Sequence, residues 1–92
     1  MKVRVRAFAR FREIFGSEQV IDLPEEAGLD VLLKKFAESR EEGHAALFDG
    51  DGRLLSHVVL MHNRRRVEDA AVGGTALSDG DEVAVFPPVA GG

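Results

Sequence analysis

One amphipathic helix, standing alone among segments that alternate like β-strands, restricts the fold of this chain more than any other feature. Residues 28–40 carry apolar side chains at positions i, i+3, i+4 and i+7, which fall on one stripe of an α-helix. These residues are Leu29, Leu32, Leu33 and Phe36. Because a helix buries such a stripe only against another apolar layer, the rest of the chain has to supply a sheet with a matching face.

The beginning of the chain predicts the first strand of that sheet. Residues 2–8 alternate between basic and small apolar side chains, and this period of two places the valines on a buried face. Phe8 falls on the opposite, basic side. Residues 10–15 indicate a short helical turn, and residues 18–23 indicate a second strand that returns tightly as the hairpin partner of the first.

Three further strands are predicted in the second half of the chain. Residues 57–62 include four consecutive apolar positions, which indicates a strand that is central or covered on both faces. The pattern leaves open whether Met61 faces the core or the solvent. Residues 64–67 and 82–86 predict a fourth and a fifth strand.

This order of elements predicts an α+β fold of the β-grasp (ubiquitin-like) type. One main helix lies across one face of a mixed sheet of four to five strands, with the two terminal strands parallel at its centre. Residues 43–53 and 70–77 are expected to be irregular connections. Residues 1–86 then form a single β-grasp domain, and residues 87–92 form a flexible C-terminal tail that leaves from the middle of the sheet.

Composition argues against several classes of function. The 92 residues include no cysteine, which removes disulfides, thiolate metal ligands and thiol catalysis. A net charge of −4 argues against nucleic-acid binding, and no leader or long apolar run is seen, so we expect a cytoplasmic protein without membrane contact. His57 and His62 stand five residues apart on one strand and point to opposite faces, which argues against a metal site. No catalytic motif is found, so no catalytic side chain and no bound cofactor are expected.

The C-terminal residues are the candidate functional segment. The run Phe86-Pro87-Pro88-Val89-Ala90-Gly91-Gly92 has no charge and no reactive side chain. Prolines favour an extended path, and glycines without a Cβ can enter a slot that is too narrow for other residues. The alternative is a loose glycine-rich end, but the pattern favours a tail that presents the α-carboxylate of Gly92 to other enzymes.

Two aromatic side chains predict a docking surface. Phe86 has the opposite parity to Val83 and Val85, and Phe8 has the opposite parity to the valines of the first strand. Both rings are therefore expected on the outer face of adjacent central strands, where they would form an apolar patch of the kind that marks a binding site. Burial of both rings in the core is the competing interpretation.

Both ends of the chain resemble the ubiquitin-like sulfur carriers. Leu77-Ser78-Asp79-Gly80-Asp81-Glu82-Val83, followed by the Phe86 to Gly92 run, is similar to the ending of MoaD, the small subunit of molybdopterin synthase, and of the small archaeal modifier proteins. Phe8-Ala9-Arg10-Phe11-Arg12-Glu13 resembles the opening strand and turn of MoaD. The turn at 49–55 and the strand after it look more like the archaeal modifier branch. The likeness spans nearly the whole chain.

The resemblance implies a carrier that other proteins act upon. In this family an E1-like activating enzyme, of the MoeB or UbaA type, uses ATP to adenylate the terminal glycine, which here is Gly92 preceded by Gly91. Sulfur transfer then gives a thiocarboxylate, or the acyl group is joined to a lysine of a target protein as an isopeptide. The outer sheet face of MoaD docks the activating enzyme and the large synthase subunit, MoaE. The partner interface implied here consists of Phe8, Arg12, Met61, Phe86, Pro87, Pro88 and Val89, although a solvated Arg12 is nearly as well supported.

Three hypotheses about function follow. The first, slightly favoured, is a ubiquitin-like modifier that also carries sulfur, monomeric when free. The second is a dedicated molybdopterin synthase small subunit without protein conjugation. The third is an interaction-only ubiquitin-like module, whose sheet binds partners while its tail is inert.

Overall fold

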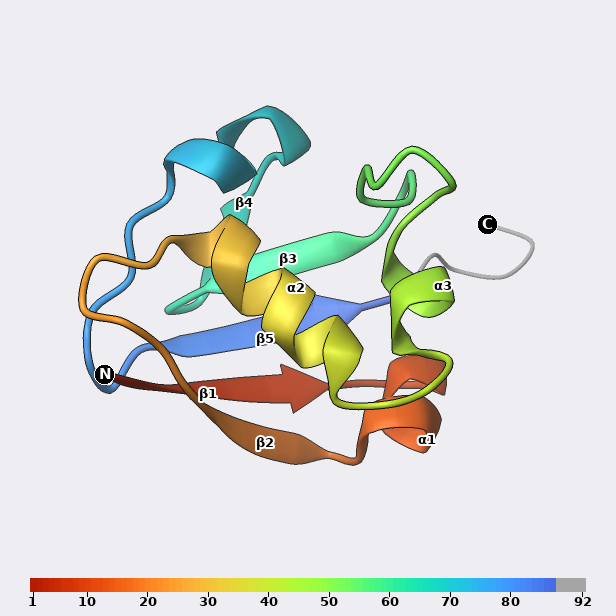
Figure 1. Ribbon diagram of the computed structural model, residues 1–92, viewed down its shortest axis with the longest axis horizontal. Helices are drawn as coiled ribbons and strands as arrows, with labels where there is room; N and C mark the ends of the chain where they lie inside the picture. The colour runs from red at the N-terminus through yellow and green to blue at the C-terminus, as the bar shows by residue number, and fades with distance from the viewer. Residues whose placement is uncertain (88–92) are drawn as a thin grey trace.

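The computed structural model of this protein describes residues 1–87, and residues 88–92 lie outside the described part. A mixed five-stranded sheet forms one layer, and α2 crosses one of its faces (Figure 1). In chain order the elements are β1 (Lys2–Ala7), α1 (Arg10–Phe15), β2 (Glu18–Asp22), α2 (Leu29–Glu38), α3 (Gly43–Leu47), β3 (Val59–His62), β4 (Arg65–Val67), the 3-10 helix η1 (Asp69–Gly74) and β5 (Glu82–Phe86).

The strand order is β2-β1-β5-β3-β4, which places the last strand at the centre of the sheet. β1 and β5 pair in parallel, from Arg4 opposite Glu82 to Ala7 opposite Val85. The other three neighbouring pairs are antiparallel. The β-grasp arrangement predicted from the sequence, with the terminal strands parallel in the middle, is therefore confirmed.

The core lies between α2 and the inner face of the sheet. All four residues of the predicted helical stripe are at most 1% exposed. The fully buried residues that face them from β1, β3 and β5 are Val3, Val5, Leu60, Val83 and Val85. Burying each such side chain stabilises the fold by about 1.5–3 kcal/mol, so this interface supplies most of the cohesion between the two layers.

The predicted loop over 43–53 is wrong in its first half, where α3 forms. Gly43, the first residue of the predicted irregular connection, instead begins a helix and is itself buried. A Cβ at this position would lie 2.1 Å from the carbonyl oxygen of Ala37. The lack of a side chain therefore allows α3 to pack against the end of α2 more closely than any other residue would permit.

Smaller differences have local causes. β1 and β2 are antiparallel as predicted, and α1 forms over Arg10–Phe15, where a short helical turn was predicted. β3 begins two residues later than predicted, at Val59, because His57 adopts a positive φ of 68° that interrupts the extended backbone. Residues 70–77, which were predicted to be irregular, overlap with η1, a single short 3-10 helix over Asp69–Gly74.

Candidate functional site

Phe8 and Phe86 stack on each other on the outer face of the sheet, the face turned away from α2. Their ring centroids lie 4.5 Å apart and their planes differ by 10°. The parallel register of β1 and β5 produces this contact, because Ala7 is opposite Val85 and the N–H of Phe8 donates to the Val85 carbonyl at 3.3 Å. Both rings are half-buried and neither belongs to the buried core. The prediction of two outward aromatics on adjacent strands is confirmed.

Three apolar side chains extend this surface: Val59 and Met61 on β3, and Ala84 on β5. Val59 lies opposite Phe86, and Met61 lies opposite Ala84. Leu60 between them is fully buried, so Val59 and Met61 face outward. The orientation of Met61, left open by the sequence, is thereby decided. Below, the outer apolar patch means Phe8, Val59, Met61, Ala84 and Phe86.

Sequence reasoning missed part of this surface although the signal was present. Val59 and Ala84 have the same strand parity as Met61 and Phe86, so the alternation that found two residues of the patch also identifies its other members. Val20 is a further case: it lies opposite Arg4 on the outer face of β2 and is 59% exposed.

Arginines border the outer apolar patch. The guanidinium carbon of Arg6 lies 5.3 Å from the centroid of the Phe8 ring, which is a cation–π distance. Arg66 lies opposite Met61 on β4. Arg12 is exposed on α1, and its N–H donates to the carbonyls of Ala9 at 3.0 Å and Phe8 at 3.4 Å, so its backbone lies in the first helical turn after the Phe8 strand.

The turn between Phe8 and α1 is strained. Ala9 has φ 52° and ψ −129°, a combination that glycine tolerates far better than alanine. The N–H of Phe11 closes this turn on the Phe8 carbonyl at 3.1 Å. The reversal lets Phe8 end the strand with its ring on the outer face while the chain departs into α1.

An aspartate network fixes the point at which β5 begins. One carboxylate oxygen of Asp81 lies 2.7 Å from Nε2 of His62 and accepts the Ser78 N–H at 2.8 Å, and the other accepts Nδ2–H of Asn63 at 3.1 Å. Burial acts to raise the pKa of Asp81, but the hydrogen bonds from His62, Asn63 and Ser78 outweigh it and hold the pKa below its ordinary value. The network ties the β3–β4 turn to the start of the strand that carries Phe86.

Of the predicted tail, residues 87–92, the structure describes only Pro87. Pro87 is half-buried and directly follows β5. Pro88, Val89, Gly91 and Gly92 lie outside the described residues, so their predicted roles stay predictions. Over residues 1–87, no three His, Cys, Asp or Glu side chains gather as metal ligands would. No helix in the same range combines the length and apolar character needed to cross a bilayer.

The parallel terminal strands, the helix across one sheet face and the patch leading to the C-terminal segment define a ubiquitin-like β-grasp protein. The sequence model of the ThiS family matches residues 5–92, and the chain belongs to that family.

Individual relatives agree with this assignment. Small archaeal modifier protein 3 of Haloferax volcanii is 38% identical over 93 aligned residues that cover all of both chains. A molybdopterin synthase sulfur carrier subunit of Chlamydomonas reinhardtii is 33% identical, again over all of both chains. The crystal structure of SAMP1 from Haloferax volcanii superimposes with a TM-score of 0.88, at 28% identity and with both chains fully covered. These relatives are named as modifiers and sulfur carriers rather than as catalysts.

Proposed function

We propose that this protein is a ubiquitin-like modifier and sulfur carrier whose reactive group is the carboxylate of Gly92. An E1-like activating enzyme adenylates this carboxylate with ATP. The acyl group then either receives sulfur, to give a thiocarboxylate that donates sulfur to an acceptor, or is joined to the lysine of a target protein through an isopeptide bond.

The chemistry requires activation from outside. A free carboxylate is a poor acylating agent, because its leaving group would be hydroxide or oxide. Adenylation replaces that leaving group with AMP, after which a sulfur donor or an amine can attack the carbonyl carbon. This chain contributes the acyl group and a surface that binds the enzyme, and none of its side chains takes part in the reaction.

The observation that carries the proposal is the similarity to small archaeal modifier protein 3 along the entire chain, which includes the Gly91-Gly92 segment. The fold supports it as well. Phe86 belongs both to the outer apolar patch and to the last strand, so an enzyme bound to the patch sits beside the first residue of the tail. At about 3.1–3.3 Å per residue, a tail of the predicted length 87–92 reaches roughly 20 Å into such an enzyme.

The outer apolar patch is the proposed docking surface. Phe8, Met61 and Phe86 are the predicted interface residues that belong to it, and Pro87 directly follows Phe86. Arg6 and Arg66, which border the patch, and Arg12, which is exposed on α1, favour a partner that presents carboxylates around an apolar contact, because complementary charge steers association and fixes orientation.

A dedicated molybdopterin synthase small subunit is the second candidate. The full-length match to the Chlamydomonas reinhardtii sulfur carrier subunit favours it. In that case the large synthase subunit would occupy the outer apolar patch, the thiocarboxylate would be the only product, and no lysine would be modified.

Intact-mass measurement tests the proposal. The protein is incubated with an E1-like enzyme and a sulfur source, with and without ATP. We expect an ATP-dependent species in which sulfur replaces one oxygen, and we expect it to disappear when Gly91 and Gly92 are deleted. Sulfur incorporation that persists in the deleted protein, or is absent from the intact one, would refute the activated tail.

A second experiment separates the two candidates. Adducts of higher mass in cells that make the tagged protein, lost with the same deletion, indicate conjugation, whereas a thiocarboxylate without adducts indicates the dedicated synthase subunit. Because Arg66 is the last basic residue, trypsin leaves residues 67–92 on a modified lysine, and peptide searches have to include that remnant.

A further inference from the structure

The chain holds few amines, and most of them are engaged. The α-amino group of Met1 donates to the Leu23 carbonyl at 2.7 Å, and it lies 3.6 Å from a carboxylate oxygen of Glu25. An amine in such contacts has to be released before its lone pair can attack a carbonyl carbon.

Two of the three lysines converge on one aspartate at the β2 edge of the sheet. Nζ of Lys2 lies 3.0 Å from the Asp22 carboxylate, and Nζ of Lys35 donates to the Asp22 backbone carbonyl at 2.6 Å. The hydrogen bond from Lys2 is the main reason that the pKa of Asp22 is lowered. Nζ of Lys34, the third lysine, makes no hydrogen bond or ion pair within the described range 1–87.

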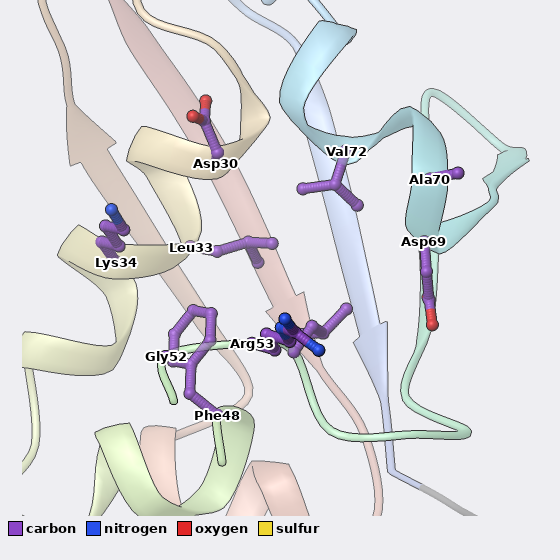
Figure 2. Close-up of a pocket in the computed structure, with 10 residues that line it drawn as sticks. Asp30, Leu33, Lys34, Phe48, Gly52, Arg53, Asp69, Ala70 and Val72 are labelled. Atoms are coloured by element: carbon purple, nitrogen blue, oxygen red, sulfur yellow. The ribbon is translucent and has the colours of Figure 1, made fainter. Parts of the chain in front are cut away.

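Lys34 lines two hollows on the α2 side of the molecule. It lines a hollow of about 540 Å³ between α2, the turn after Phe48 and η1, in which Figure 2 shows Leu33 and Val72 directed toward each other from opposite walls. It also lines a second hollow of about 370 Å³, which continues toward Glu38 and α3. An extended chain that approaches the amine therefore meets a partly apolar trough.

Lys34 and the outer apolar patch lie on opposite sides of the molecule. Lys34 is on α2, the helix that covers the inner face of the sheet (Figure 1). Lys2 has the strand parity of Arg4 and Arg6, so it lies on the outer face. A copy that is bound through its outer face consequently keeps Lys34 accessible, while Lys2 lies on the side that the partner covers.

We infer that Lys34 is an acceptor site for conjugation, and that the donor is a second copy of this same chain. The inference rests on the proposed function. Nζ of Lys34 attacks the Gly92 carbonyl carbon of an acyl-adenylate formed from ATP by the activating enzyme. A C–N bond forms, the C–O bond to the adenylate breaks, AMP leaves with the electron pair, and the proton of the amine passes to solvent. The product is a branched dimer.

Full-length protein incubated with an E1-like activating enzyme and ATP tests this assignment, with tryptic peptides read by mass spectrometry. Linkage at Lys34 blocks cleavage there, so it gives residues 13–35 joined to residues 67–92. Linkage at Lys35 gives residues 35–40 with the same branch, so adjacent lysines are distinguished. Lys34→Arg keeps the charge and the helix propensity but removes the acceptor, and Lys2→Arg and Lys35→Arg are matched controls.

We expect the linked dimer to be lost in Lys34→Arg and retained in both controls, while the adenylate of Gly92 forms equally in all four proteins. A dimer that persists in Lys34→Arg, or whose branch maps to another amine, overturns the assignment. Adducts on other proteins without any dimer overturn it too, although the proposed function then stands. If no adenylate forms in any of the proteins, the proposed function itself has failed.

Discussion

The Phe86 ring stacks on Phe8 at the surface instead of packing among the core side chains, so it should matter more for binding than for stability. We expect Phe86→Ala to lower the free energy of unfolding by about 1–2 kcal/mol, from half-burial and the lost stack. Leu60→Ala, on the same sheet but fully buried, should cost about 2–5 kcal/mol. Urea denaturation followed by circular dichroism gives both values.

The same Phe86→Ala protein should be a poor substrate for the activating enzyme, because the proposed docking surface loses a central ring. The rate of ATP–pyrophosphate exchange, measured against concentration of the carrier, checks this. A stability loss as large as that of Leu60→Ala would place Phe86 in the core. Unchanged exchange in a folded variant would remove the outer apolar patch from docking.

Strand parity alone predicted that Phe8 and Phe86 face outward, since a period of two needs no knowledge of the partner strand. Their stacking could not be predicted in the same way. It depends on a parallel register between residues almost eighty positions apart, which only the assembled sheet defines. The orientation of Val20, in contrast, does not depend on this register. The alternation of side chains along its strand already indicates that it faces outward, and its exposed fraction of 59% agrees with that.

At the scale of elements, the junction between α2 and α3 depends on Gly43. A Cβ at this position would meet the Ala37 carbonyl oxygen at 2.1 Å and its carbonyl carbon at 2.9 Å. We expect Gly43→Ala to lower the free energy of unfolding by about 1–3 kcal/mol, because backbone atoms would have to move apart. Gly50→Ala is the matched control, since nothing lies within 4 Å of its added Cβ. Equal unfolding midpoints for the two variants would contradict the close packing.

The sequence predicted α2 well and α3 not at all, for a physical reason. α2 carries a full apolar stripe, whereas α3 is only five residues long, and a helix of that length has too few hydrogen bonds to form by itself. Its conformation depends on packing against α2. A glycine at its start also looks, in sequence, like the end of the preceding helix.

The Asp81 network predicts a pH dependence for the join between the β3–β4 turn and β5. The pKa of Asp81 is lowered in the folded state, so its contribution to stability is fully present above the unfolded value of about 3.9. That contribution is lost as the pH falls through the folded value. The free energy of unfolding of the wild type, measured by urea denaturation, should therefore fall more than that of Asp81→Asn as the pH drops from about 5 toward about 3. These two pH limits lie about one unit above and about one unit below the unfolded pKa. Parallel pH profiles for the two proteins would show that the network adds no stability.

At the scale of the whole molecule, a two-layer fold gives one small chain two separate faces for the proposed docking and acceptor roles. The parallel pairing of β1 and β5 puts the last strand in the centre of the sheet, so Phe86 of the outer apolar patch stands directly before the C-terminal segment. α2 covers the other face and carries Lys34. The roles of donor and acceptor in the proposed dimer consequently involve opposite sides of the protein.

This separation predicts that one substitution has different effects in the two roles. A donor with Lys34→Arg is mixed with an acceptor that lacks Gly91 and Gly92, so only one linked product is possible. Phe86→Ala in the donor should abolish that product, because the donor has to dock on the activating enzyme through its outer face. Phe86→Ala in the acceptor should leave the yield unchanged, since Lys34 lies on the far side of the sheet. Loss of product in the acceptor variant would mean that both copies need the outer apolar patch, and that the two faces do not act independently.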